Sequence, residues 1–217
     1  MDEYYWDYVN EKTKMGLYIT KTEKKLIDES LEEEKILLDV GGGSGRFAVP
    51  LYEKGYNIVC LEKDFIPLKK LNRKNSGIKS VRADAADMPF KDNTFDCIIA
   101  VQIIDYLPEE QFLKEITRIL KNKGKLILTI SNKNSLRNFL RKSNHKNFYK
   151  YSFEEMKEIL KGLGFDIKKA RGYCWVPFKR ASNNKLIPVF SFMEKTFQLK
   201  FFYSVSPWVF IEAIVEK

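Results

Sequence analysis

The sequence has few of the residues that build metal centres and disulfide frameworks. Its 217 residues include one histidine and three cysteines, and no two cysteines form a C-x-x-C pair. Cys60 and Cys97 fall within apolar runs, where a free thiol packs as a small hydrophobic group. This pattern predicts a reduced, cytoplasmic protein without a metal site or a disulfide framework.

Long apolar runs and a leader-like N-terminus are also missing. No apolar stretch approaches the roughly 20 residues that a transmembrane helix needs. The first eight residues are acidic and aromatic, whereas a secretory signal peptide begins with basic and then apolar residues. With 44% hydrophobic and 31% charged residues, the chain has a globular composition, and its length fits one domain.

The net charge of +9 is unevenly distributed along the chain. Residues 1–38 hold six Lys against ten Asp and Glu, whereas residues 133–200 hold sixteen Lys and Arg against five Asp and Glu. Such a basic surface attracts nucleic acid, an anionic membrane surface or an anionic metabolite. A lysine-rich, solvated surface without any ligand explains the same counts equally well.

The sequence does contain a glycine-rich loop between an apolar run and a helical pattern. The run over 36–39 leads into glycines at positions 41, 42, 43 and 45, and a second apolar run ends in Glu62. Bare backbone after one strand lets a ligand approach closely, and an acid at the tip of the next strand suits two ribose hydroxyls. The spacing of about 20 residues between them predicts a nucleoside cofactor.

The glycine spacing discriminates between two classes of cofactor. A dinucleotide fingerprint, G-x-G-x-x-G, would need glycine at position 44 or 46, where the sequence has serine and arginine. The spacing Asp39-x-Gly41-x-Gly43-x-Gly45 instead resembles motif I of the class I S-adenosylmethionine (SAM)-dependent methyltransferases. The glycine spacing opposes a NAD-linked oxidoreductase, and a catalytically silent SAM-binding subunit stays open as an alternative.

The resemblance runs from about residue 36 to residue 165. It is closest to the small-molecule branch that includes the quinone-biosynthesis methyltransferases. It implies that Asp84 binds the adenine amino group and that the backbone of Ala85 binds the adenine ring. Gln102, at the tip of the fourth strand, is expected to line the methionyl end of the cofactor. The expected cofactor-binding residues are Asp39, Gly41, Gly43, Gly45, Glu62, Asp84, Ala85 and Gln102.

Apolar runs alternate with amphipathic helical patterns, which predicts a parallel sheet covered on both faces. Strands are expected near 36–40, 57–62, 78–82, 95–101 and 124–131, and helices over 108–121 and 153–162. The resemblance implies an α/β fold with a Rossmann-like, seven-stranded, mostly parallel sheet and an antiparallel C-terminal hairpin. The expected organisation is a single methyltransferase domain over 1–217, with an N-terminal helical cap at 1–35, a SAM-binding core at 36–165, and a closing hairpin at 166–217 that contains a substrate-side insertion at 177–199.

Catalytic residues follow less directly from the pattern than cofactor-binding residues. SAM carries an activated methyl group, so the protein mainly orients the acceptor, and a general base is needed only if the acceptor loses a proton. Asp105 and Tyr106 follow the fourth strand, and His145 is the sole histidine. These three residues are the candidates, although His145 lies in a basic stretch typical of a surface loop.

Two segments outside the predicted core are expected to cover an acceptor. One is the insertion at 177–199. The other is the N-terminal segment with its aromatic residues, for which packing between helices is an equally good explanation. These aromatic residues are Tyr4, Tyr5, Trp6, Tyr8 and Tyr18.

The expected activity is methyl transfer from S-adenosyl-L-methionine to O, N or C of a small or medium-sized metabolite. Two alternatives stay open: an RNA or protein methyltransferase that uses the basic C-terminal third, and a methyltransferase of a membrane-associated lipid or quinone that uses 177–199. The chain lacks the Asn/Asp-Pro-Pro-Tyr loop of the adenine-amino methyltransferases after its fourth strand. A small-molecule acceptor is therefore preferred over nucleic acid, and the sequence predicts no oligomeric state.

Overall fold

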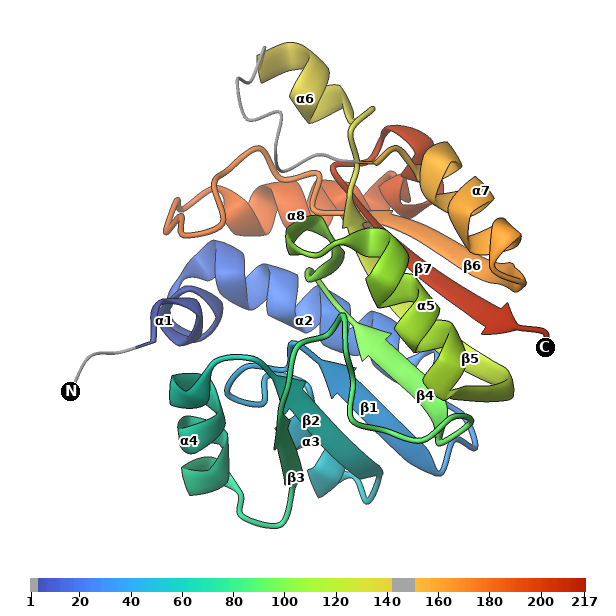
Figure 1. Ribbon diagram of the computed structural model, residues 1–217. Coiled ribbons are helices and arrows are strands. Elements are labelled where there is room, and N and C mark those ends of the chain that lie inside the picture. Colours follow the sequence, from blue (N-terminus) through green and yellow to red (C-terminus); the bar gives the residue numbers. More distant parts are fainter. Residues whose placement is uncertain (1–3, 142–150) are drawn as a thin grey trace.

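The computed structural model describes residues 4–141 and 151–217 (Figure 1). The strands are β1 (Ile36–Val40), β2 (Asn57–Glu62), β3 (Lys79–Arg82), β4 (Phe95–Ala100), β5 (Leu120–Ser131), β6 (Phe165–Tyr173) and β7 (Trp208–Val215). The α-helices are α1 (Tyr5–Lys12), α2 (Lys14–Asp28), α3 (Ala48–Glu53), α4 (Phe65–Lys74), α5 (Glu109–Ile119), α6 (Leu136–Arg141), α7 (Phe153–Gly162) and α8 (Ile187–Thr196). Short 3₁₀ turns are η1 (Ile104–Tyr106), η2 (Leu199–Phe201) and η3 (Tyr203–Val205).

The seven strands form one sheet in the order β3-β2-β1-β4-β5-β7-β6. All neighbouring pairs are parallel except those that involve β7, which runs antiparallel to β5 and β6. This arrangement confirms the predicted α/β class with its antiparallel C-terminal hairpin. The chain winds outward from β1 to β3 and then returns to the other side of β1, so β1 and β4 flank the topological switch point, where ligands of such sheets bind.

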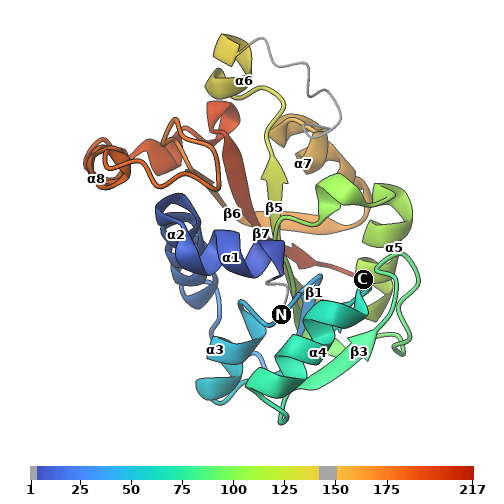
Figure 2. The same cartoon turned by 90° about the vertical axis from the view of Figure 1, so that its left-hand side faces the viewer.

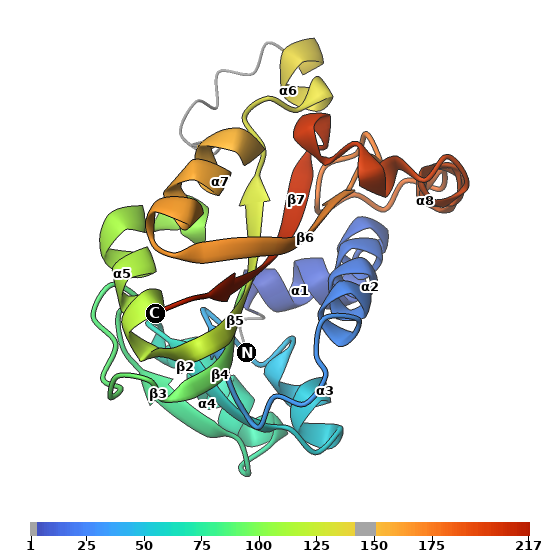
Figure 3. The same cartoon turned by 90° about the vertical axis from the view of Figure 1, so that its right-hand side faces the viewer.

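Helices cover both faces of the sheet. The apolar sides of α5 and α7 pack on one face, and those of α2, α3 and α4 pack on the other. Figure 3 shows α5 and α7 on one side of the strands and α2 and α3 on the opposite side. The central strands β1 and β4 are consequently mostly apolar, as expected for strands that are buried on both faces.

The predicted strand positions agree with the structure, with one difference at β5. This strand begins at Leu120, four residues earlier than expected, and α5 ends at Ile119. A helix over 108–121 was expected because Gly124 suggested a C-terminal stop. In the structure Leu120 is extended and pairs with Phe95, so sheet pairing ends the helix and Gly124 lies inside the strand.

The N-terminal region forms two helices that meet at a sharp corner at Thr13. Thr13 is extended, and its side chain accepts a hydrogen bond from the backbone N–H of Gly16, which caps the start of α2. A side chain at position 16 would collide with the backbone oxygen of Val9, so glycine allows the close crossing of α1 and α2. This corner also contacts the segment before α8, because the N–H of Met15 donates to the carbonyl oxygen of Ser182.

The expected insertion at 177–199 contains α8, which lies beside α2 (Figure 2). Two of its residues anchor the helix: Ile187 is buried in the core, and the carboxylate of Glu194 accepts hydrogen bonds from the Tyr18 hydroxyl and the Trp175 N–H. The opposite side of α8 is exposed and rich in apolar side chains.

Candidate functional site

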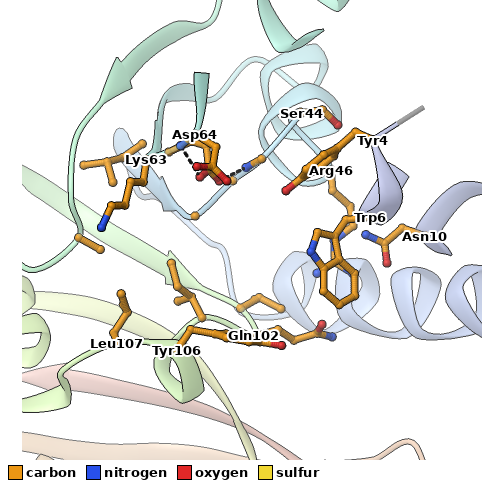
Figure 4. A pocket seen from close by; sticks show the side chains of 18 of the residues that line it. Tyr4, Trp6, Asn10, Ser44, Arg46, Lys63, Asp64, Gln102, Tyr106 and Leu107 are labelled. Carbon is orange, nitrogen blue, oxygen red and sulfur yellow. Dashed lines mark hydrogen bonds between the residues drawn. The ribbon is translucent and has the colours of Figure 1, made fainter. Parts of the chain in front are cut away.

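A cavity of about 390 Å³ opens at the C-terminal ends of β1, β2 and β4. Its size falls within the usual range for small-molecule and cofactor sites. Figure 4 shows Lys63 and Leu107 on one side of this cavity and Trp6 and Asn10 on the other. The loops after β1 through β4 line it together with α1 and one residue from the segment before α8.

The glycine loop after β1 forms one wall of this cavity. Gly41 and Gly43 have φ values of +67° and +58°, in the left-handed region that favours glycine. A side chain on Gly41 would collide with Ile103, whereas the space around a Cβ on Gly43 is empty to 4 Å. Gly45 does not line the cavity, and its missing side chain lets the loop pack against Leu71 of α4.

Glu62 stands at the end of β2, beside the glycine loop. Strands β1 and β2 pair in register up to Val40 and Leu61, so the loop and Glu62 emerge from the sheet as neighbours. The two carboxylate oxygens of Glu62 accept the backbone N–H groups of Gly43 at 3.1 Å and Asp64 at 3.0 Å. These bonds orient the carboxylate in the cavity wall, and each oxygen keeps a further lone pair.

Asp84 and Ala85 line the cavity at the end of β3, about one strand-helix unit beyond Glu62. One oxygen of Asp84 accepts the Ala86 N–H at 2.9 Å, and the other forms an ion pair with Lys63 at 2.8 Å. The hydrogen bonds from Lys63 and from Ala86 hold the pKa of this carboxyl below its usual range. Ala85 is nearly buried and offers only a small side chain at the cavity wall.

Gln102 follows β4 with φ of +60°, an unusual backbone conformation for a residue other than glycine. Its backbone N–H donates to Thr129 at 2.7 Å, and its side-chain amide donates to the carboxylate of Glu23. The fully buried Glu23 also accepts the hydroxyl of Tyr173 at 2.7 Å and pairs with Arg46 at 2.8 Å. Gln102 therefore connects the cavity wall to a buried polar cluster beneath it.

Asp39 lies beneath the glycine loop rather than in the cavity wall. Its side chain is buried, and one carboxylate oxygen has no hydrogen-bond partner in the described part of the chain. Burial raises the pKa of Asp39 to about 7. The Arg46 guanidinium and the Ala48 N–H oppose this rise, and the charge of Glu62 adds to it.

The three candidate catalytic residues are placed differently. Tyr106 lines the cavity, and burial raises the pKa of its hydroxyl, a shift that Arg180 opposes and Asp105 increases. Asp105 is buried and is not part of the cavity lining. His145 lies outside the described residues.

Among the N-terminal aromatic residues, Tyr4 and Trp6 line the cavity. Tyr5 and Tyr8 are exposed, and Tyr18 bonds to Glu194 of α8. The expectation of an aromatic cover therefore applies to two of the five residues, and Tyr18 packs between helices instead.

Sequence reasoning missed several residues of the site. Glu23 could have been found, because it continues the four-residue spacing of buried Met15, Ile19 and Ile27 along α2. A carboxylate on an apolar stripe indicates a buried polar partner. No local signal places Arg180 in the cavity, since tertiary contacts bring it there from the segment before α8.

The described residues, 4–141 and 151–217, contain no group of three His, Cys, Asp or Glu side chains that could hold a metal ion. In the same ranges, no helix combines the length and the apolar character that crossing a bilayer requires.

Residues 38–128 match the family described as the methyltransferase domain. A methyltransferase candidate from Encephalitozoon cuniculi is 30% identical over 66% of this chain and 76% of its own length. The ubiquinone/menaquinone biosynthesis C-methyltransferase UbiE of Blochmanniella pennsylvanica is 26% identical over 76% of this chain and 67% of its own. An uncharacterized protein of Methanocaldococcus jannaschii is 36% identical over 52% of this chain, and the match spans only about half, 49%, of that relative's length.

Solved structures show the same fold. The crystal structure of a SAM-dependent methyltransferase from Thermotoga maritima superimposes with a TM-score of 0.69. The match covers 98% of this chain and 93% of the other at 24% sequence identity.

Replacement of Asp39 by Asn should change how stability depends on pH. The pKa of Asp39 is raised from 3.8 in the unfolded chain to about 7 in the folded protein, so ionisation opposes folding as the pH rises through this window. The wild-type protein should lose up to roughly 4 kcal/mol between pH 4 and pH 7, whereas Asp39→Asn should not. Thermal unfolding from pH 4 to pH 8 measures this, and parallel curves for the two proteins would contradict it.

Proposed function

Because this chain belongs to the class I SAM-dependent methyltransferases, we propose that it methylates O, N or C of a small or medium-sized metabolite. The observation that carries this proposal is the cavity at the switch point of the sheet, where a bare glycine loop lies beside an oriented carboxylate. A cavity of about 390 Å³ lined by side chains from several loops suits a small acceptor better than a folded macromolecule.

The residues around the cavity fit the chemistry of SAM. The empty space beside Gly43 allows a ligand to touch the backbone of the loop. Glu62 has a free lone pair on each oxygen, which suits two ribose hydroxyls. We place the adenine ring against Ala85, with its amino group near Asp84. The methionyl end would then lie near Gln102.

SAM supplies a methyl group already activated on a sulfonium, so the chain's own task is to bind, orient and exclude water. Tyr4 and Trp6 of the N-terminal segment close one side of the cavity against solvent. This segment is held in place because Asp7 pairs with Lys70 of α4 at 3.4 Å and also binds the Ser44 hydroxyl. The raised pKa of Tyr106 keeps its hydroxyl protonated at neutral pH, which suits hydrogen-bond donation to an acceptor better than proton abstraction.

Replacement of Gly43 by Ala should weaken cofactor binding strongly and reduce methyl transfer below detection. The added methyl group would occupy the space where the ligand meets the loop. We expect S-adenosylhomocysteine (SAH) to bind at least tenfold more weakly, measured by titration calorimetry. Mass spectrometry of a small-molecule extract treated with methyl-labelled SAM should show a labelled product with the wild-type protein and none with the variant.

Gly55→Ala is the matched control, because Gly55 also has a positive φ, +93°, and open space around its Cβ, but lies away from the cavity. It carries a comparable backbone strain and should leave SAH affinity unchanged. Equal SAH affinity in Gly43→Ala would place the cofactor elsewhere. If the label enters only RNA or protein, the alternative is favoured in which the basic C-terminal third binds a macromolecular acceptor.

Replacement of Glu62 by Gln should weaken SAH binding by about 1.5–3 kcal/mol, the scale of hydrogen bonds to a charged group. The amide retains the size of the side chain but has only one accepting oxygen. Calorimetry should therefore show a loss of affinity of roughly ten- to a hundredfold. Glu53→Gln, at an exposed acid of α3, is the control, and unchanged affinity in Glu62→Gln would remove this residue from the cofactor site.

A second candidate is a methyltransferase of a membrane-associated lipid or quinone, and the exposed side of α8 favours it. Phe192 and Phe197 are 68% and 63% exposed, and further exposed apolar side chains continue along the chain to residue 205. Several exposed apolar side chains in one segment of a protein mark an interaction surface. Lysines are interspersed with them in the sequence, and the sole acid between 177 and 205 is Glu194, which is buried against Tyr18. Apolar side chains interspersed with lysines suit an anionic bilayer.

Vesicle binding tests this second candidate. The protein should sediment with vesicles of phosphatidylcholine and phosphatidylglycerol, and less with phosphatidylcholine alone or at high salt. Phe192→Ser should weaken this binding roughly tenfold, because the bilayer no longer buries an aromatic ring. Phe65→Ser, at a ring on α4 that is 57% exposed, is the control. Equal sedimentation of wild type and Phe192→Ser would exclude α8 as a membrane contact.

A further inference from the structure

Arg180 is a partly buried cation in the wall of the cavity, on the side formed by α1, and its Nε is fully enclosed. Its guanidinium carbon lies 5.0 Å from the centre of the Trp6 ring and 5.5 Å from that of Trp208. One terminal nitrogen donates to the side-chain oxygen of Asn10 at 2.8 Å. Two aromatic rings and an amide thus hold the guanidinium in the wall of the cavity; Figure 4 shows two of these partners, Trp6 and Asn10.

This guanidinium has no counter-ion in the described part of the chain. Its Nε is buried without a hydrogen-bond partner there, and no described carboxylate forms an ion pair with it. The carboxylate that acts on it most is that of Glu23, which is already bound to Arg46, Gln102 and Tyr173. A buried charge normally has a partner of opposite sign, because burial removes its solvation.

The surroundings of Arg180 destabilise its positive charge, so binding of an anion there would be favourable. Burial lowers the pKa of its guanidinium, and repulsion from Arg46 lowers it further, against the attraction of Glu23. Of the charged side chains that act on Arg180, Arg46 is positive and Glu23 is negative, and Glu23 is already paired with Arg46. The carboxyl of Asp39 acts on Arg46 but is not among the groups that act on Arg180. A ligand anion would balance the charge of Arg180, since an arginine fork binds carboxylates and phosphates with two parallel hydrogen bonds.

We propose that Arg180 binds an anionic group, a carboxylate or a phosphate, of the methyl acceptor. This inference rests on the proposed function, because it assigns the acceptor side of the same cavity. Arg180 lines the cavity and donates to Asn10, which Figure 4 shows across the cavity from Lys63. Lys63 pairs with Asp84, beside which we place the adenosine. The rings of Trp6 and Tyr106 flank the same space, so an acceptor with a flat, apolar body and an acidic group fits it.

Cation–π contact alone does not explain this arrangement. Contact with the faces of Trp6 and Trp208 provides no hydrogen-bond acceptor for the five N–H donors of the guanidinium. Asn10 accepts from one of these donors, whereas the buried Nε has no partner among the described residues. A purely structural arginine would be expected to satisfy that donor within the protein, as nearly all buried polar groups do.

The test uses defined probes on protein saturated with SAH. Calorimetric titrations compare benzoate and phenyl phosphate with benzamide, which has the same ring and no charge. The wild-type protein should bind at least one anion about tenfold more tightly than benzamide. The anion that binds more tightly shows whether the group is a carboxylate or a phosphate. Arg180→Gln should lose this preference, whereas Lys179→Gln, at an exposed neighbouring cation, should keep it.

The titration of SAH itself separates the possible failures. Absence of SAH binding by the wild-type protein would contradict the proposed function, whatever the probes do. With SAH bound, equal affinities for benzamide and the anions, or no binding of either anion, would overturn the role of Arg180. A tenfold loss of SAH affinity in Arg180→Gln would also overturn it, because the residue would then hold the carboxylate of the cofactor. If thermal unfolding shows that Arg180→Gln does not fold, Arg180→Lys, which keeps the charge, should retain only part of the preference.

Discussion

The buried carboxylate of Glu23 holds the candidate site together. It extends from α2 and is bound by Arg46 of the glycine loop, by Gln102 after β4 and by Tyr173 of β6. A carboxylate buried away from solvent is stable only when such partners bind it. The positions of these elements therefore depend on one another. The cluster therefore couples the glycine loop to the C-terminal hairpin, and the sheet order shows no strand pairing that connects the two directly.

The same cluster explains the unusual backbone of Gln102. A residue with a side chain adopts φ near +60° only when its surroundings impose it. Here its N–H is held by Thr129 and its amide by Glu23, so both ends of the residue are fixed. The turn after β4 is thereby rigid at the switch point of the sheet. A rigid wall at that point is what positioning one reactive atom against another requires.

The parts of the fold and site that sequence predicted are those that depend on neighbours along the chain. The strands follow from apolar runs, and the glycine loop follows from glycines at a fixed spacing. Glu62 follows from the number of residues that separate it from that loop. The start of β5 at Leu120 did not follow, because pairing with Phe95 overrode a local signal for helix continuation. Glu23 was visible only as an acid on an apolar stripe, and Arg180 is brought to the cavity by contacts between distant segments.

This difference between local and distant residues also separates the two halves of the site. The wall to which we assign adenosine is built from the ends of consecutive strands. Its residues therefore lie in one part of the sequence and form a motif that relatives can share. The opposite wall combines Trp6 from α1, Tyr106 after β4 and Arg180 before α8. Changes confined to these three side chains would leave the contact between Asp7 of α1 and Ser44 of the glycine loop in place. We therefore infer that specificity for the acceptor depends on the geometry of this second wall, where Arg180 has no ion-pair partner among the described residues.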